Sequence, residues 1–524
     1  MQDREFSSPE FSGLRAFFWP VHRKEMKKFF PMFLLFFLIF FDYNLLRPMK
    51  DALIVTAKSS GAEVIPFIKV WVMFPSAVLL TFIFTRLSNR FRFETVFYVM
   101  MGAFLLYFFL FAFVAYPHRE ELHLNDFANS LEIWLPAGFK GMIAMIRYWL
   151  YTSFYVVSEL WSPIILSVLF WGFANQVTRI GEAKRFYGLF GIGANISGAA
   201  AGALSYMVCL HQYNPSLPFG SDAWEQSLDT QILFVIAAGL IALGIFRWMH
   251  LTVLKDPLYY DPAKEKLEGV KGKLSMRENF SLLWKTPYLF YIALIVISYN
   301  LVINLTEVVW KHEVKALYPL PQDYNLYMSQ ITLFTSIVAT LSAMIISGNA
   351  VRFFGWRFTA LLTPVVLFIT SLGFFGFMLL QDSFSLSSFA AIGASTLSIA
   401  VFFGSAQNIM SRAAKYSVFD ATKEMAFIPL SSELKLKGKA AIDGVGSRLG
   451  KSGGSLIHQT LLLTFTSITA SAPYVAGFLF AAIGIWLAAT WKLGRKFNEL
   501  AHGVPSELEQ PQEKTQKDLF VLQE

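Results

Sequence analysis

The chain has 524 residues, of which 55% are hydrophobic and only 15% are charged, whereas soluble domains carry about 25% charged residues. So few charges cannot cover the surface of a soluble protein of this length, and the composition instead indicates a bundle of helices in lipid. The net charge of +8 fits an excess of Lys and Arg in cytoplasmic loops, and it gives no reason to expect a nucleic-acid partner.

Long apolar stretches recur along the whole chain. A membrane span requires about 20 mostly apolar residues. We predict an all-α integral membrane protein with twelve transmembrane helices, the fourth of which is overlong and kinked near Pro163 or tilted. In chain order the predicted spans are 29–48, 64–86, 93–116, 142–177, 186–210, 230–253, 286–310, 326–350, 357–380, 386–411, 440–466 and 473–494.

The loops between these spans alternate in charge. Cations gather in every second loop, while the opposite loops hold fewer, namely Lys58, Arg119, Lys311 and Lys315. The bias predicts that the N-terminus and the C-terminus both lie in the cytoplasm. Asp3, Glu5 and Glu10 are atypical of a signal or transit peptide, which favours a bacterial inner membrane over an organelle.

A charged segment at 254–285 divides the chain into two six-helix halves, and short sequence segments of one half match segments of the other. Tyr43-Asn44-Leu45 matches Tyr299-Asn300-Leu301, and the same offset sets Asp51 against Glu307. This indicates two repeats of the major-facilitator type with the substrate between them. The predicted parts are a cytoplasmic segment 1–28, a half 29–253, the linker 254–285, a half 286–494 and a cytoplasmic tail 495–524.

Charges in or beside the first span suggest a binding site. Tyr43, Arg47 and Lys50 fall on one helical stripe, which makes an aromatic and cationic face suited to an anion. The alternative is that the cations extend to the membrane interface, with Asp51 neutralising Lys50. An ionisable residue within a span costs about 2.5–3.5 kcal/mol on insertion scales, and therefore usually has a function.

Two acids in later spans are further candidates. Glu159 lies among apolar residues of the fourth span, either for function or for a hydrogen bond to a neighbouring helix. Arg147 is predicted on the same helix, about 18 Å away along its axis, as a separate cation or an interfacial one. Glu307 near the end of the seventh span is either interfacial or close to a substrate cation or a coupling proton.

The segment Gly444 to Gly454 resembles a phosphate loop but lacks the required first glycine, because that position is Val445, and no βαβ unit surrounds it. On a helix, Gly444, Arg448, Lys451, Ser455 and His458 instead form one stripe, in which two cations and hydroxyls suit an oligophosphate. The alternative is a glycine seam for helix packing. Asn195 in the fifth span is an additional candidate.

A membrane-embedded transferase is the main alternative class. Such an enzyme would show a close acid–His or metal-ligand cluster, and no His of this sequence has such a spacing. We therefore expect a carrier with no catalytic residue, no metal and no cofactor.

Several of these segments resemble one family, the ATP/ADP translocases of plastids and of intracellular bacteria such as chlamydiae and rickettsiae. The resemblance covers about residues 14–496. It rests chiefly on Leu46-Arg47-Pro48-Met49-Lys50-Asp51, Gly61-Ala62-Glu63-Val64-Ile65-Pro66-Phe67, Ser158-Glu159-Leu160-Trp161, Glu182-Ala183-Lys184-Arg185-Phe186-Tyr187, Asn304-Leu305-Thr306-Glu307 and Gly450-Lys451-Ser452-Gly453-Gly454.

The resemblance implies twelve spans and exchange of external ATP for internal ADP. The family's functional charges fall by motif on Lys50, Glu159, Glu307 and Lys451. In the expected mechanism of alternating access, Lys50, Lys451 and Arg448 hold the phosphates, and the acids pair with cations in the empty carrier. Pro48 and Met49 depart from the family's usual motif, and a proton-coupled importer of ATP, GTP, UTP and CTP is the alternative.

Overall fold

The computed structural model describes residues 19–257, 259, 286–345, 350–380, 395–430, 434–435, 438–439, 442 and 446–501. All regular structure in these residues is helical. Several predicted parts lie wholly or partly outside the described residues: 1–18 of the N-terminal segment, most of the linker, the start of the span 386–411, residues 443–445 of the glycine-rich segment and 502–524 of the tail.

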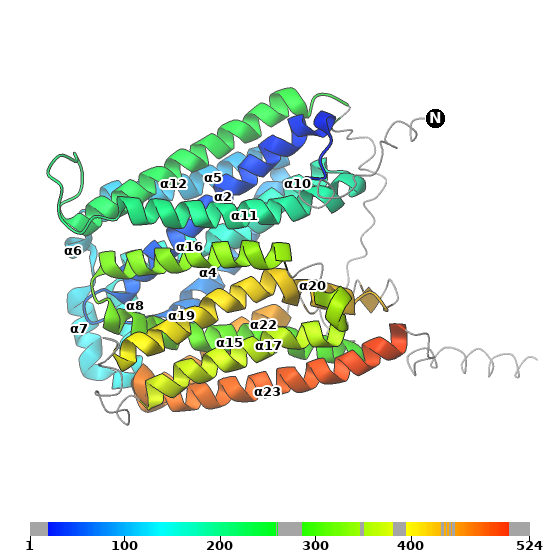
Figure 1. Cartoon of the computed structure of the whole chain (residues 1–524). Helices are drawn as coiled ribbons and strands as arrows, with labels where there is room; N and C mark the ends of the chain where they lie inside the picture. The colour runs from blue at the N-terminus through cyan, green and yellow to red at the C-terminus, as the bar shows by residue number, and fades with distance from the viewer. Residues whose placement is uncertain are drawn as a thin grey trace, which may run out of the picture. The chain divides into compact units, whose positions relative to one another are not determined.

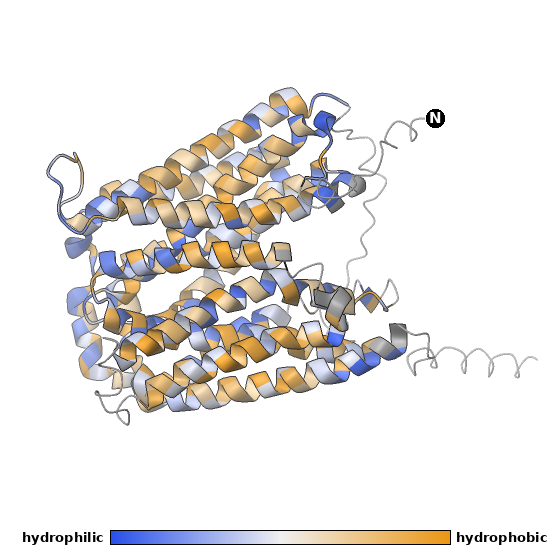
Figure 2. Ribbon diagram, in the orientation of Figure 1, coloured by the Kyte–Doolittle hydropathy of each residue, from blue (hydrophilic) through white to orange (hydrophobic). Residues whose placement is uncertain are grey.

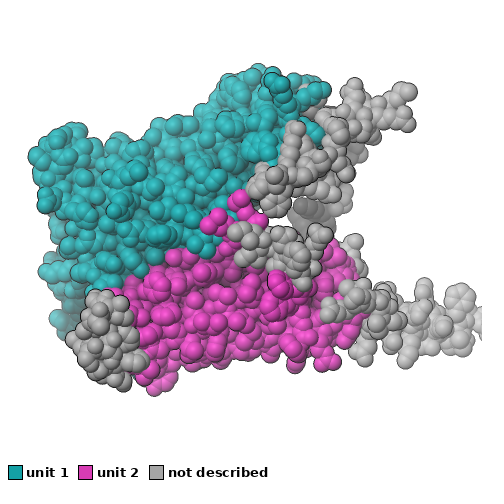
Figure 3. Space-filling view, viewed as in Figure 1, with its two compact units in different colours: residues 1–271, 311–340, 462–468 teal, residues 272–310, 341–461, 469–524 magenta. Residues whose placement is uncertain are grey.

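The chain forms two compact units, shown in different colours in Figure 3. Unit 1 comprises residues 1–271, 311–340 and 462–468, and unit 2 comprises the others. The predicted division at the linker into halves 29–253 and 286–494 stays a prediction.

In unit 1, α2, α5, α11 and α12 lie side by side, and α9 packs against α2 (Figure 1). Its helices include short 3₁₀ (η1, η4) and π-helical (η2, η3, η5, η6) segments. Their bounds are η1 Arg23–Glu25, α2 Met26–Val55, α3 Val64–Phe67, η2 Ile68–Met73, α4 Phe74–Arg90, α5 Phe93–Leu110, η3 Phe111–Ala115, α6 Arg119–Leu122, α7 Asn125–Trp134, η4 Ala137–Phe139, α8 Lys140–Arg147, α9 Trp149–Trp161, η5 Ser162–Phe170, α10 Trp171–Val177, α11 Ile180–Val208, α12 Ala223–Trp248 and η6 Met249–Val253.

In unit 2, α17 and α19 pack along each other. The remaining helices are α15 Pro287–Leu317, α16 Pro321–Ile345, α17 Ala350–Leu379, α19 Thr396–Ala414, η7 Lys415–Phe419, α20 Asp420–Ala426, α22 Ser447–Phe465 and α23 Ile468–Ala501. The last two turns of α15, from Lys311, and α16 up to Thr340 belong to unit 1.

Nine helical segments among the described residues are long and apolar enough to cross a membrane. Three further helices are long enough but less apolar: α11 with 29 residues, and α19 and α22 with 19 each. Figure 2 shows hydrophobic residues along the middle of α23 and hydrophilic ones toward its C-terminal end, as a bilayer requires. The all-helical membrane fold is confirmed, whereas the exact count of twelve spans stays a prediction.

Two predicted helix ends are wrong in the same way. The first span was expected to end at residue 48 and the seventh at residue 310, but α2 continues to Val55 and α15 to Leu317. In both cases the helix continues through the charged residues that follow its predicted end. Lys50 and Lys311 therefore lie inside their helices, and Pro48 is accommodated within α2.

The predicted span 142–177 is also interrupted. Tyr148 has φ −101° and ψ 48° and separates α8 from α9. Arg147 and Glu159 consequently lie on different helices, which corrects the expectation of a shared one. The predicted irregularity near Pro163 takes the form of the π-helical segment η5, where the missing N–H of proline is tolerated in a wider turn.

The repeated Tyr-Asn-Leu motif has the same local structure in both units. The Asn44 side chain donates a hydrogen bond to the Phe40 carbonyl at 2.9 Å, and that of Asn300 donates to the Val296 carbonyl at 2.8 Å. Each asparagine also lies next to a glycine of a later helix, Gly198 in unit 1 and Gly450 in unit 2.

The α15–α22 contact in unit 2 has no space for added side-chain atoms. A Cβ at Gly450 would lie 2.6 Å from the Ile297 carbonyl oxygen and 2.7 Å from the Asn300 Cβ, while one at Gly454 would lie 2.9 Å from the Asn304 Cβ. Gly453, on the same helix, has nothing within 4 Å. The glycines thus form a packing seam between the two helices.

We predict that Gly450→Ala lowers the yield and apparent melting temperature of the purified protein, because α22 must move away from the α15 backbone by several tenths of an ångström. Overpacking of this kind costs about 1–3 kcal/mol. Gly453→Ala is the matched control and should leave both quantities unchanged. Equal melting temperatures for the two variants would contradict the seam.

Candidate functional site

Lys50 lies at the centre of a group of buried charges in unit 1. Its Nζ is 3.0 Å from Asp51 Oδ1 and 3.2 Å from Glu159 Oε2. The same Nζ lies 3.9 Å from the centroid of the Tyr155 ring, so the aromatic face adds a cation–π contact. Residues of α2 and α9, distant in sequence, therefore surround one lysine.

Asp51 joins this group to a second lysine. Its Oδ2 is 2.9 Å from Lys311 Nζ, on the last turns of α15. Lys311 was expected in an outer loop, and this expectation is wrong because α15 continues beyond residue 310. We define Lys50, Asp51, Glu159 and Lys311 as the charge cluster.

The four members of the charge cluster differ in exposure. The side chains of Lys50, Asp51 and Lys311 are 3%, 0% and 1% exposed, but that of Glu159 is 32% exposed. The cluster contains two cations and two acids, so it carries no net formal charge. Burying such charges is tolerable only when they are paired with good geometry. Glu159 is the member that can move away from its partner at the lowest desolvation cost.

The surroundings of Glu159 hold it close to α2. The indole Nε1 of Trp161 donates a hydrogen bond to the Ile39 carbonyl at 3.0 Å, which ties the end of α9 to α2. Trp161 itself is fully buried, and the π-helical segment η5 begins one residue later. The backbone that carries Glu159 is thus anchored on α2 just before a stretch of irregular helix.

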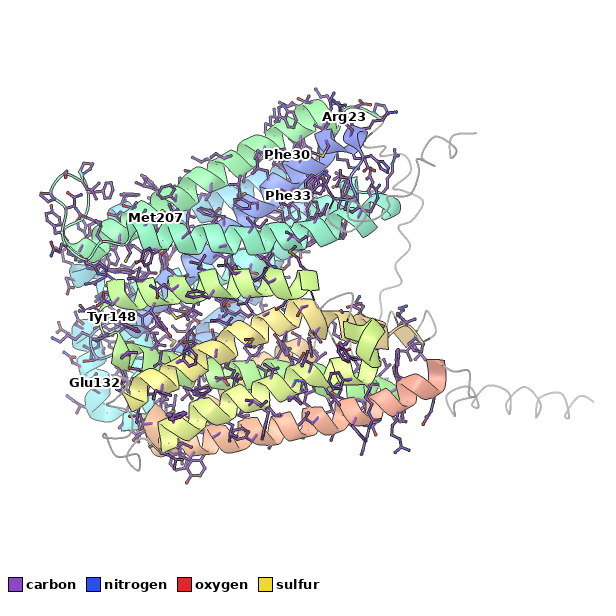
Figure 4. The ribbon with its side chains drawn as sticks, in the orientation of Figure 1. Arg23, Phe30, Phe33, Glu132, Tyr148 and Met207 are labelled. Atoms are coloured by element: carbon purple, nitrogen blue, oxygen red, sulfur yellow. The ribbon has the colours of Figure 1, made fainter. Side chains whose placement is uncertain are left out.

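The other predicted residues of unit 1 lie in different settings. Tyr43 and Arg47 on α2 and Asn195 on α11 are half-buried. Arg147 binds α7, with Nη1 donating to Asn129 Oδ1 at 2.8 Å and Nη2 at 2.8 Å from Glu132. Figure 4 labels Glu132 on α7 and Tyr148 where α8 gives way to α9. These contacts of Arg147 support a structural role.

In unit 2 the predicted stripe on α22 divides into two parts. Arg448 and Lys451 are exposed. Ser455 and His458 are buried against α15, with Ser455 Oγ 3.4 Å from Asn304 Oδ1 and His458 Nε2 3.0 Å from the Leu305 carbonyl oxygen. Only the first part of the stripe, with its two cations, is available to a ligand; Gly444 lies outside the described residues.

Glu307 is half-buried on α15, next to a polar network of unit 2. The Gln407 Nε2 donates to Thr306 Oγ1 at 2.9 Å and to Ser371 Oγ at 2.8 Å. This network connects α15, α17 and α19 beside the acid.

The comparisons with known proteins agree on one family. Residues 4–497 match the model of the TLC ATP/ADP transporter family. The chain belongs to this family of ATP/ADP transporters. ADP,ATP carrier protein 1 of Chlamydia muridarum is 46% identical over 487 residues, covering 93% of this chain and 92% of the relative. ADP,ATP carrier protein 2, chloroplastic, of Arabidopsis thaliana is 40% identical over 500 residues, covering 95% and 79%.

ADP,ATP carrier protein 1 of Rickettsia bellii is 38% identical over 494 residues, covering 94% of this chain and 97% of the relative. Among solved structures, a bacterial homologue of the iron transporter ferroportin in its inward-facing state has a TM-score of 0.52 at 13% identity, covering 92% of this chain and 100% of that one. This likeness concerns the fold alone and supports the major-facilitator-like class. Membership of a transporter family removes the transferase alternative.

We predict that Lys311→Met destabilises the protein, because the charge cluster then holds one acid in excess. Breaking a buried pair by removing one partner costs about 3–5 kcal/mol. The double variant Asp51→Asn, Lys311→Met leaves the neutral pair of Lys50 and Glu159 and should recover part of this loss. Apparent melting temperatures of the purified proteins test the prediction. If the double variant is no more stable than the single one, Lys311 does not compensate Asp51.

Proposed function

We propose that this chain exchanges ATP for ADP across a bacterial inner membrane by alternating access, with Lys50 as a binding residue for the nucleotide phosphates. One observation carries the proposal: a lysine inside a helix of the bundle is held between two carboxylates, of which Glu159 is the more exposed. Membership of the TLC family and relatives named ADP,ATP carrier protein support the substrate.

The arrangement suggests how phosphate would bind. A phosphate oxygen carries the same kind of charge as the Glu159 carboxylate and forms strong charge-assisted hydrogen bonds with an ammonium group. Phosphate would therefore replace Glu159 at Lys50, while Asp51 and Lys311 stay paired at 2.9 Å. The displaced carboxylate, already 32% exposed, would turn toward water.

The same exchange of partners at Lys50 explains why a carrier without bound nucleotide would not switch readily between its two conformations of alternating access. When the nucleotide leaves, Glu159 returns to Lys50 and restores the neutral cluster. A conformational change that separated them without cargo would leave a buried lysine uncompensated on one side, which is costly. Transport would then require a nucleotide in each direction, which is exchange.

Other residues are proposed as ligands as well. Lys451 and Arg448 are exposed on α22 and present two cations to solvent, a pair that suits phosphate. Arg47 is a further phosphate ligand, Tyr43 offers an aromatic face for the base, and Asn195 is an additional polar candidate. Glu307 is proposed as a second gating acid besides Glu159, since it is a half-buried carboxylate inside α15.

The cations of alternate loops support a topology in which both termini lie in the cytoplasm. Nucleotide exchange in this orientation would bring ATP in from outside the cell and release ADP.

We predict that the purified protein in liposomes takes up labelled ATP only when ADP is loaded inside. Empty vesicles should show no more uptake than protein-free vesicles, because a carrier without bound nucleotide would not make the conformational change that returns its site to the outside. The measurement compares the two loadings at a fixed pH. Uptake into empty vesicles, increased by an acidic exterior and shared by GTP, UTP and CTP, would instead establish the proton-coupled importer.

We also predict that Lys451→Ala abolishes exchange in ADP-loaded liposomes, since one of the phosphate-binding cations is lost. Lys492→Ala is the matched control: it removes an exposed lysine from another helix, α23, and should retain wild-type uptake. Both proteins must elute as the wild type does in size-exclusion chromatography. Wild-type uptake by Lys451→Ala would remove this residue from the site.

A further inference from the structure

Asp42 is a buried acid of α2 outside the charge cluster. It lies in the middle of α2, and its side chain is fully inaccessible to solvent. Neither Oδ1 nor Oδ2 has a hydrogen-bond partner in the part of the chain that the structure describes. Such an orphaned carboxyl is rare, because buried polar groups are almost always hydrogen-bonded.

The immediate surroundings of Asp42 on α2 are apolar. Ile39, Leu45 and Leu46, within one helical turn of it, are each 0% exposed. Lys50 is eight residues away, which corresponds to about 12 Å along the helix axis. That lysine is already occupied by Asp51 and Glu159.

The helices that pack on α2 carry ionisable groups, but within the described residues none of them forms a hydrogen bond with the Asp42 carboxyl. Those near the ends of the helices are paired elsewhere: Lys28 with Glu182, Glu25 with Arg185, and Glu225 with Arg119. The ionisable side chains that the structure describes on η1, α9, α11, α12, η6 and the neighbouring turns of α15 and α16 are Arg23, Lys24, Glu25, Tyr151, Tyr155, Glu159, Glu182, Arg185, Tyr187, Tyr206, Glu225, Asp229, Arg247, His250, Lys311, His312, Glu313, Lys315, Asp323, Tyr324 and Tyr327.

The electrostatic consequence concerns the protonation state. An isolated ionised carboxylate in an apolar interior is so unfavourable that the group takes up a proton instead. A neutral carboxylic acid in the same position loses only its hydrogen bonds to water. With no cation beside it, Asp42 is therefore stable in this packing only in its protonated form.

We propose that Asp42 is a proton-binding site, loaded in this packed conformation and emptied when water reaches the middle of α2. On emptying, the O–H bond of the carboxylic acid breaks, the proton passes to water, and a hydrated carboxylate remains. Because α2 also carries Lys50, the state that holds the proton is the state in which Lys50 is paired with Glu159. The consequence for transport rests on the proposed nucleotide exchange, whereas the protonation itself does not.

Infrared spectroscopy tests the protonation directly. The full-length protein in lipid is compared with D42N at neutral pH, and the difference spectrum should contain the carbonyl band of a protonated carboxylic acid, shifted to lower frequency in heavy water. D42V gives the same difference if D42N does not fold. The control D126N removes an exposed acid on α7 and should show only carboxylate bands. Carboxylate bands in the D42N and D42V differences would overturn the proposal.

Transport in ADP-loaded liposomes tests the coupling. Wild-type ATP uptake should fall as the pH on both sides is raised, because deprotonation of Asp42 disfavours the packed state. D42N, which cannot release a proton at this position, should keep the same uptake over that range. Parallel pH profiles for the two proteins would overturn the coupling. A wild-type protein without ATP uptake would contradict the proposed exchange, and the infrared comparison would still decide the proton site.

Discussion

The arrangement of this protein depends on one constraint, the cost of placing a charge where water is absent. Lys50 and Lys311 are both almost fully buried, and two acids neutralise them within 3.2 Å. The requirement for neutrality fixes where α9 and the end of α15 must lie against α2. The same constraint underlies the proposed binding of phosphate, because an anion that replaces a carboxylate leaves the balance of charge nearly unchanged.

The sequence identified much of this site because charged residues are rare in apolar stretches. Lys50, Asp51 and Glu159 stood out for that reason, and the structure brings them together. Lys311 was missed because a charge at the expected end of a helix was read as the start of a loop. Its spacing of four from Glu307 on one continuous helix was the available signal. Asp42 was overlooked because it is neighboured by the more prominent Tyr43, Arg47 and Lys50.

Packing was harder to predict than composition. The helix is interrupted at Tyr148 by its backbone angles, and no proline or glycine stands there to indicate a break. Arg147 and Glu159 were therefore expected on one helix. The glycine segment on α22 admitted both a ligand-binding and a packing interpretation. Gly450 and Gly454 pack on α15, whereas ligand binding by the exposed Arg448 and Lys451 stays a prediction. Helical spacing alone could not distinguish them, because residues of the one predicted stripe differ in exposure: Arg448 and Lys451 are exposed, whereas Ser455 and His458 are buried.

The contact between α15 and α22 has a mechanical consequence. Backbone and side-chain atoms of α15 occupy the space beside Gly450 and Gly454, so neither helix can rotate or slide along the other without a collision. The two helices are therefore expected to move together as a rigid pair. A displacement of α22 at Lys451 would therefore also displace α15 and, with it, Glu307. Side chains between the helices would instead yield and absorb part of that displacement.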